Sequence, residues 1–254
     1  MKTKILEIKN LTKRFGGLTA VAGLDFEVRE GEILGMIGPN GAGKSTTFNL
    51  IAGAYPASGG EVRFAGENIL GLPPHRIAAR GVLRTFQHNR PFSGMSVLEN
   101  VLVGAHTQFR GGVFSAKARE EEAQRRRRAQ ELIEFVGLGE LREADVGTLS
   151  FGQGRLLEIA RALAGEPKLM LFDEPAAGLT PAELERLAGI IRGIAARGIA
   201  VLLIEHDMHF LLPLAHRVVV LNFGAKIADG LPDDIRANPA VTEAYLGSSH
   251  AAAR

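Results

Sequence analysis

Two glycines, a lysine and a serine stand at fixed spacing between Gly38 and Thr46, which reads Gly-Pro-Asn-Gly-Ala-Gly-Lys-Ser-Thr. An apolar run precedes this stretch, and a helical pattern that ends at Gly53 follows it. A glycine-rich turn between strand and helix directs backbone N–H groups and the positive end of the helix dipole at one point. Lys44 would bridge the β- and γ-phosphates of a nucleotide, and Ser45 would ligate Mg²⁺.

The stretch therefore predicts a site for a nucleoside triphosphate. The alternative is an ordinary glycine-rich turn, which the Lys-Ser pair and the correct flanking patterns disfavour. The residues expected around the phosphates are Gly38, Pro39, Asn40, Gly41, Ala42, Gly43, Lys44, Ser45 and Thr46.

Acidic and imidazole side chains follow two later predicted strands. Residues 168–172 lead into Asp173 and Glu174, and residues 199–204 lead into His206 after one intervening residue. Because parallel strands end at one crevice, these groups would meet there. Asp173 would hold Mg²⁺ through a water, Glu174 would accept a proton from the attacking water, and His206 would contact the γ-phosphate. The alternatives are a capping acid and a structural histidine.

Phe15 and Gln87 have weaker signals. Phe15 lies in a predicted turn between strands at residues 5–11 and 25–29, where an aromatic ring could stack on a purine. The alternative is a hydrophobic plug under the turn. Gln87 ends a predicted strand at residues 82–86 and could reach Mg²⁺ or the attacking water. Alone, it would be a surface amide.

The elements that must position these groups change character along the chain. From about residue 96 to 165 the pattern predicts helices only, which indicates a helical subdomain inserted into an α/β core. The run Arg125–Arg128 could suggest nucleic acid, but acidic residues one helical turn away favour a solvated helix. Ser150 and two glycines precede another helix, as an anion site or as an ordinary N-cap.

Composition is that of an ordinary globular protein. The chain has 254 residues, 46% hydrophobic and 23% charged, with a net charge of +2 that gives no global case for nucleic acid. It contains no cysteine, which excludes disulfides and thiolate metal sites. No signal-peptide pattern or membrane-spanning run is visible, so we expect any membrane role to pass through a partner.

In this order the motifs resemble those of ATP-binding subunits of ABC transporters over nearly the whole chain. Phe15 matches the adenine platform, residues 38–46 Walker A, Gln87 the Q-loop, residues 149–153 the signature, 169–174 Walker B, 177–180 the D-loop, and His206 the switch histidine. The resemblance implies an α/β phosphate-loop NTPase core with a parallel sheet, an N-terminal antiparallel β subdomain and an inserted helical subdomain. We expect a single ABC ATPase domain with its core at residues 1–87 and 166–247, the insertion at 88–165, and a mobile tail at 248–254.

Among these subunits the chain most resembles the first ATPase of the LIV-type importers of branched-chain amino acids. The matching words include Arg84-Thr85-Phe86-Gln87 and the closing Glu243-Ala244-Tyr245-Leu246-Gly247. Two residues depart from the broad pattern: Phe151 replaces a signature glycine, and Thr180 replaces the D-loop aspartate. By this resemblance, Thr180 would weaken the coupling between the two ATP sites without abolishing hydrolysis.

The resemblance also implies a mechanism and partners. The cofactors would be ATP and Mg²⁺, the metal residues Ser45, Gln87 and Asp173, and the catalytic residues Glu174, His206 and Gln87. Two ATPase subunits would sandwich ATP between Walker A of one and Ser150, Phe151, Gly152 and Gln153 of the other.

Integral membrane permease subunits would dock near Asn89, Phe92 and Met95 at the cytoplasmic face of the inner membrane, and a substrate-binding protein would be an indirect partner. Another cargo (urea, amides or lipopolysaccharide) is the main alternative. A soluble ABC ATPase acting on nucleic acid and a phosphate-loop kinase are less favoured, and no nucleic acid partner is expected.

Overall fold

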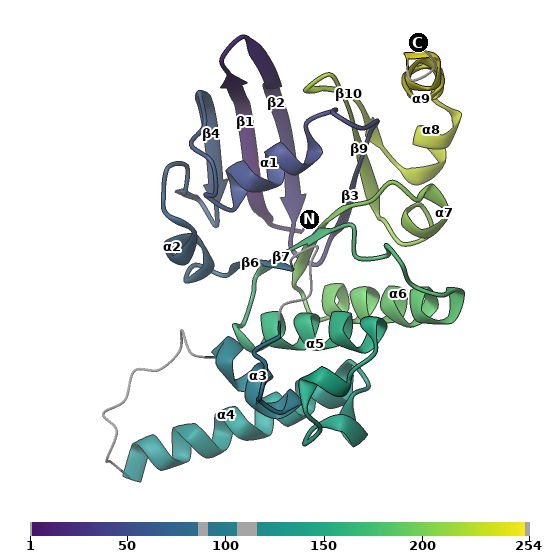
Figure 1. The fold of residues 1–254 in the computed structure, drawn as a ribbon. Coiled ribbons are helices and arrows are strands. Elements are labelled where there is room, and N and C mark those ends of the chain that lie inside the picture. Colours follow the sequence, from purple (N-terminus) through teal and green to yellow (C-terminus); the bar gives the residue numbers. More distant parts are fainter. Residues whose placement is uncertain (1, 86–90, 106–115, 252–254) are drawn as a thin grey trace.

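The computed structural model describes residues 2–85, 91–105 and 116–251. It contains a four-stranded sheet in the order β2-β1-β4-β5 and a six-stranded sheet in the order β10-β9-β3-β8-β7-β6 (Figure 1). The strands are β1 (Lys4–Phe15), β2 (Leu18–Arg29), β3 (Ile33–Ile37), β4 (Gly59–Phe64), β5 (Glu67–Asn68), β6 (Val82–Thr85), β7 (Leu169–Asp173), β8 (Ala200–Ile204), β9 (Arg217–Asn222) and β10 (Ala225–Gly230).

The larger sheet is parallel except at one edge. Strands β9, β3, β8, β7 and β6 pair in parallel, and only β10 turns back antiparallel on β9. Every residue of β3, β7 and β8 is buried, which fits their near-continuous apolar sequences. Because these strands run the same way, the residues after Ile37, Phe172 and Ile204 emerge at one edge of the sheet.

The smaller sheet is antiparallel, as the sequence predicted, but its first two strands are longer than the predicted ranges 5–11 and 25–29. Residues 4–15 and 18–29 form one long hairpin that turns at Gly16 and Gly17. Register shifts interrupt the pairing between Ile8 and Arg14, and they break the alternation of buried and exposed residues.

Helices lie on both faces of the six-stranded sheet. They are α1 (Lys44–Ile51), α2 (Pro74–Ala78), α3 (Val97–Gly104), α4 (Ala116–Phe135), α5 (Phe151–Ala164), α6 (Pro181–Ala196), α7 (Met208–Leu211), α8 (Pro232–Ala237) and α9 (Pro239–Ala251), with short 3₁₀ turns η2 (Gly139–Leu141) and η3 (Val146–Thr148). Helices α3, α4 and α5 lie together below the sheets in Figure 1 and form the predicted helical part. None of the described helices is long and apolar enough to cross a membrane.

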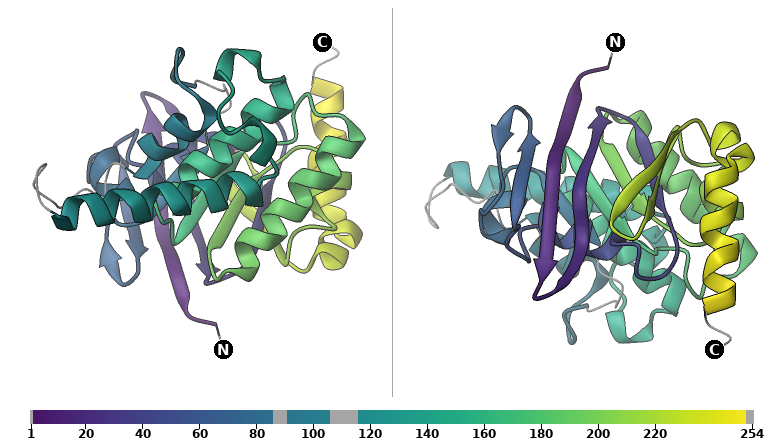
Figure 2. Two further views of the ribbon diagram at one scale, coloured as in Figure 1. Left: turned by 90° about the horizontal axis from the view of Figure 1, so that it is seen from below. Right: turned by 90° about the horizontal axis from the view of Figure 1, so that it is seen from above.

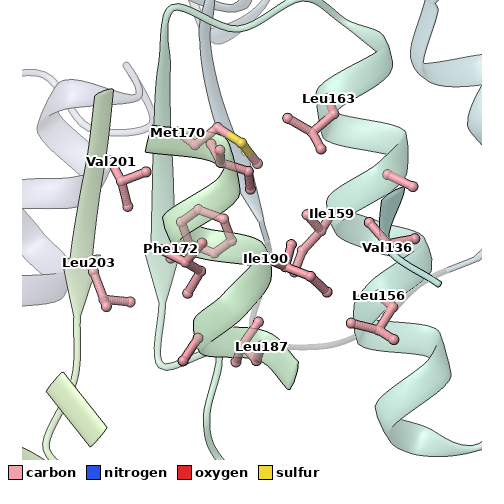
Figure 3. Packing of buried hydrophobic residues seen from close by; sticks show 14 of the residues in the cluster. Val136, Leu156, Ile159, Leu163, Met170, Phe172, Leu187, Ile190, Val201 and Leu203 are labelled. Atoms are coloured by element: carbon pink, nitrogen blue, oxygen red, sulfur yellow. The ribbon is translucent and has the colours of Figure 1, made fainter. Parts of the chain in front are cut away.

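The six-stranded sheet separates α1 from α5. On β7, Met170 and Phe172 join a cluster with α5 and α6, whereas Leu169 and Leu171 join a second cluster with Phe48 of α1. Figure 3 shows the first cluster, in which leucine and isoleucine side chains of α5 and α6 meet Phe172 and the neighbouring β8. The phosphate loop and the signature helix are therefore mounted on opposite faces of one sheet.

The described C-terminal segment ends in helix α9. The expected tail began at Ser248, but α9 continues through Ala251, and residues 252–254 lie outside the described part of the chain. Helices α8 and α9, in yellow, lie at the edge of the molecule opposite β4 (Figure 2). Helix α9 packs through Val241 against the larger core cluster.

Candidate nucleotide site

Glycines shape the loop between β3 and α1. Gly38, Gly41 and Gly43 have φ of 150°, 79° and 98°, which side-chain-bearing residues rarely adopt. A Cβ on Gly38 would lie 2.1 Å from the carbonyl oxygen of Leu221, and one on Gly43 would lie 2.4 Å from that of Ala20. The backbone packs so closely at both positions that only glycine fits.

Lys44 is folded into this loop. Its side chain is buried, and Nζ donates to the carbonyl oxygens of Gly38 at 2.6 Å and Pro39 at 3.0 Å. Burial lowers the pKa of Lys44, while the nearby carboxylates of Glu174 and Asp173 act in the opposite direction. The ammonium is thus held by the loop carbonyls and lies within electrostatic reach of the acidic strand end.

The start of α1 presents the remaining loop residues. The Ser45 side chain is exposed, and Thr46 is half-buried. The Thr47 hydroxyl donates to the carbonyl oxygen of Gly43 at 2.9 Å, which anchors the helix to the loop. The helix N-terminus and the exposed hydroxyl of Ser45 are therefore available to an anion and to its counter-ion.

Asp173 ends β7 and is held by an arginine that the sequence analysis did not assign a role. Arg84 on β6 donates to Asp173 Oδ2 at 2.6 Å, and through its other amino group to Asn49 Oδ1 at 2.7 Å. Both charged side chains are mostly buried. The signal for Arg84 is its position inside an otherwise apolar strand, where a charge requires a partner.

The structure brings Glu174 and His206 together, as predicted. Their strands are neighbours, with Asp173 opposite Ile204, and His206 Nδ1 lies 3.8 Å from Glu174 Oε1. Glu174 has φ of 48°, a left-handed conformation that is uncommon for a residue with a side chain. Such strain is frequent at functional sites.

Glu205, which directly follows β8, is the second residue that the sequence analysis left without a role. It is fully buried, and Oε1 accepts from the backbone N–H of Ala176 at 2.9 Å. Burial raises its pKa, whereas the Ala176 amide and then the charge of His206 lower it. The signal in the sequence for a role of Glu205 was a carboxyl residue directly after an apolar strand.

Phe15 lies at the end of β1 with 44% of its side chain exposed. The Lys13 ammonium is 4.7 Å from the ring centroid, and the Tyr55 ring meets it edge-on at 5.7 Å. The ring is fixed at the surface rather than buried under the turn. This exposure favours the predicted stacking role over the plug.

The signature residues form the cap of α5. Ser150 Oγ accepts from the Gln153 backbone N–H at 3.2 Å, and Gln153 Oε1 accepts from that of Ser150 at 2.8 Å. Phe151 is exposed, and the Arg155 guanidinium lies 5.4 Å from its ring. Since α5 and α1 pack on opposite faces of the sheet, this stretch does not join the loop of its own chain. Gly152 is the buried residue among the four.

The predicted docking residues are partly described. Phe92 and Met95 are exposed. The backbone N–H of Phe92 donates to Asn100 Oδ1 at 2.8 Å, and the Arg161 guanidinium lies 5.5 Å from its ring. Gln87 and Asn89 lie outside the described residues.

The donor chemistry fits Mg²⁺ bound together with a nucleotide. Within residues 2–85, 91–105 and 116–251, no group of three or more His, Cys, Asp or Glu side chains could hold a metal alone. Ser45 and Asp173 offer two oxygen donors, and Mg²⁺ commonly takes few protein ligands and completes its shell with phosphates and waters.

A glycine-rich loop, an acidic strand end and a signature helix on this sheet define an ATP-binding cassette. Residues 21–177 match the ABC transporter family, and the chain belongs to that family. It is an ABC ATPase. Residues 225–251 match a second family, described as branched-chain amino acid ATP-binding cassette transporter.

The chain is similar over its whole length to two curated proteins. It is 46% identical to the high-affinity branched-chain amino acid transport ATP-binding protein BraF of Pseudomonas aeruginosa, covering 98% of this chain and 100% of BraF. It is 40% identical to the corresponding LivG of Escherichia coli K12, with the same coverage.

Among solved structures, the ADP conformation of MJ1267, an ATP-binding cassette of an ABC transporter, has a TM-score of 0.85. It is 32% identical and covers 96% of this chain and 99% of its own. The predicted family and fold class are thereby confirmed.

Proposed function

We propose that this ABC ATPase energises the uptake of branched-chain or related amino acids through membrane partners. The proposed cargo rests on the similarity to BraF and LivG over 98% of this chain, together with the C-terminal family match at residues 225–251. That match includes Tyr245. Burial raises the pKa of the Tyr245 hydroxyl and the Gly38 backbone of the phosphate loop lowers it, so the matched segment lies within electrostatic reach of the nucleotide loop.

The residues have the following roles in this proposal. The loop 38–46 holds the phosphates of ATP, with Lys44 leaving its carbonyl partners to bind them. Ser45, Asp173 and Gln87 would hold Mg²⁺, which neutralises phosphate charge when bound. Glu174 accepts the proton as the water oxygen bonds to the γ-phosphorus and ADP leaves. His206, 3.8 Å from Glu174, orients that water at the γ-phosphate.

A second ATPase subunit, identical or related, completes each site. Ser150, Phe151, Gly152 and Gln153 cap the nucleotide held by the other subunit, because they cannot reach the loop of their own chain. Phe15 stacks on the adenine.

Permease subunits dock at Phe92, Met95 and Asn89 on the cytoplasmic face of the inner membrane, and a substrate-binding protein delivers the cargo. The core at residues 1–87 and 166–247 and the insertion at 88–165 are the moving parts.

The first test replaces the proposed base. Glu174→Gln should lower ATP turnover by about 10²-fold or more, because it removes a proton-transfer group. ATP binding should persist, since the loop is untouched, and equilibrium binding of labelled ATP measures it. Turnover close to that of the unaltered protein would exclude Glu174 as the base.

The cargo is tested separately. The chain is purified from solubilised membranes with its co-purifying subunits, and the complex is reconstituted into liposomes with a leucine-binding protein from the same cells. ATP-dependent uptake of leucine, absent with Lys44→Ala, is the expected result. A complex that hydrolyses ATP but moves urea or an amide instead would reject the cargo while leaving the ATPase assignment intact.

A further inference from the structure

Glu205 is a buried acid that the proposed chemistry does not use. It directly follows β8, one residue before His206, and none of its surface is exposed. A carboxyl in such a position is costly unless hydrogen bonds compensate its lost hydration. Its contacts therefore indicate what it does.

The carboxyl of Glu205 connects two segments of the site. Oε1 accepts from the backbone N–H of Ala176 at 2.9 Å. Oε2 has no hydrogen-bond partner within the described part of the chain. The side chain thus links the turn after β7 to the end of β8.

This link lies beside the strained residue of the turn. The backbone N–H of Glu174 donates to the carbonyl oxygen of Ile204 at 3.0 Å, and Pro175 has no N–H to donate. The next backbone hydrogen bond along the turn is therefore the one from the Ala176 N–H to Glu205. Together the two bonds hold Glu174, with its φ of 48°, on both sides.

We propose that Glu205 is a positioning residue that holds the turn carrying Glu174 in register with His206. The base and the histidine then move as one unit with the end of β8. An oxygen acceptor suffices for this role, so the carboxyl need not be ionised. The inference rests on the proposed assignment of Glu174 as the base.

Two substitutions of similar volume separate the hydrogen bond from packing. Glu205→Gln keeps an oxygen that can accept from Ala176, whereas Glu205→Met fills the same space without one. We expect the Gln variant to retain turnover and the Met variant to lower kcat by about 10²-fold, the effect of a small misplacement of a reacting group. KM for ATP should not change, because the phosphate loop is untouched.

The matched control is Glu32→Met. Glu32 is also buried, and its Oε2 accepts from a backbone N–H, that of Arg29, at 2.7 Å, but it directly precedes β3, at the amino ends of the parallel strands rather than the carboxyl ends that carry the site. This control should lower the melting temperature without changing kcat. All variants are assayed in the full chain, together with the membrane subunits that co-purify with it.

Coupling to the base is measured in a double mutant. If Glu205 acts through Glu174, adding Glu205→Met to Glu174→Gln should lower kcat little further. A full additional loss would overturn the proposal, as would normal kcat in Glu205→Met alone or an effect confined to KM. Normal turnover in Glu174→Gln would instead reject the base, so the two failures are distinguishable.

Hydrogen exchange keeps the proposal testable if the Met variant does not fold. In the unaltered protein and in Glu205→Gln, the Ala176 amide should exchange slowly, as a bonded buried amide does. Exchange as fast as that of the exposed Gly178 amide would show that the bond does not hold the turn.

Discussion

At the scale of single residues, the site is organised by charges that share partners. Asp173 is neutralised by Arg84 and lies near Lys44, which donates to loop carbonyls. Each of these charges is mostly removed from water and is satisfied by another part of the same site. Nucleotide phosphates and Mg²⁺ would therefore replace partners that these side chains already have.

The Arg84–Asp173 pair gives the first stability prediction. Arg84→Ala should lower the free energy of unfolding by about 3–5 kcal/mol, because it leaves a buried carboxylate unpaired. Mg²⁺ with ATP should recover part of this loss by supplying positive charge at Asp173. Urea denaturation with and without the ligands measures both effects.

The control for this prediction is Arg63→Ala, which removes an exposed pair with Glu61. Such pairs contribute at most about 1 kcal/mol. If Arg84→Ala is no more destabilising than Arg63→Ala, the buried pair does not stabilise the site.

Motif residues were predictable from sequence, and their partners were not. Short sequence motifs, whose chemistry is apparent without a fold, contain Lys44, Asp173, Glu174 and His206. The predicted approach of Glu174 to His206 is confirmed. The contact of Arg84 with Asp173 depends on the register of β6 against β7, strands 89 residues apart at these positions. No local pattern encodes that register.

At the scale of elements, helix caps fix the ends of the segments that carry function. Thr180, the departure noted in the D-loop, is the N-cap of α6 and accepts from the Glu183 backbone N–H, while Glu183 Oε2 accepts from Thr180. The threonine thus has a local structural role at this position. An aspartate would also cap the helix.

This capping box predicts a pH-dependent loss of stability. Thr180→Ala should cost about 1 kcal/mol at neutral pH, and Thr180→Asp should be nearly neutral. Hydrogen bonds from the Thr180 backbone N–H and hydroxyl lower the pKa of Glu183 below its ordinary value of 4.5. Their contribution is therefore complete above pH 4.5 and is lost as pH falls through the lowered pKa.

Thermal unfolding of both variants from neutral to acidic pH checks this sign. The difference between Thr180→Ala and the unaltered protein should shrink with acid. A difference that grows on acidification would contradict the assigned capping bonds.

Element boundaries show where sequence patterns end. The strand, loop and helix around residues 33–51 were predicted because propensity, glycine placement and hydrophobic pattern agree there. Helix α9 was missed because Gly247 and the two serines after it are weak helix formers. Its start was signalled by Asn238, whose Oδ1 accepts from the Ala240 backbone N–H, followed by Pro239.

At the scale of the whole molecule, exposed apolar side chains mark the surface proposed for the membrane partners. Phe92 and Met95, which precede α3, are 47% and 38% exposed. Phe92→Asp should weaken assembly with the permease subunits by about 10-fold or more, as expected for a central aromatic contact. ATP binding should be unchanged.

Leu231→Asp is the matched control, since Leu231 is 61% exposed and lies at the start of α8 at the far edge. Co-purification from solubilised membranes, quantified for each variant, measures assembly. Equal recovery of membrane subunits with Phe92→Asp and Leu231→Asp would exclude the docking surface.

The strand order also dictates when the protein can become functional during its synthesis. Strand β3, which carries the phosphate loop, lies between β8 and β9, whose residues are translated more than 150 positions later. At about 5–20 residues per second, the ribosome needs many seconds to supply these flanks. A nascent chain cannot form the nucleotide pocket until nearly all of it has emerged. Newly made subunits therefore gain ATP binding and readiness for assembly together, at the end of translation.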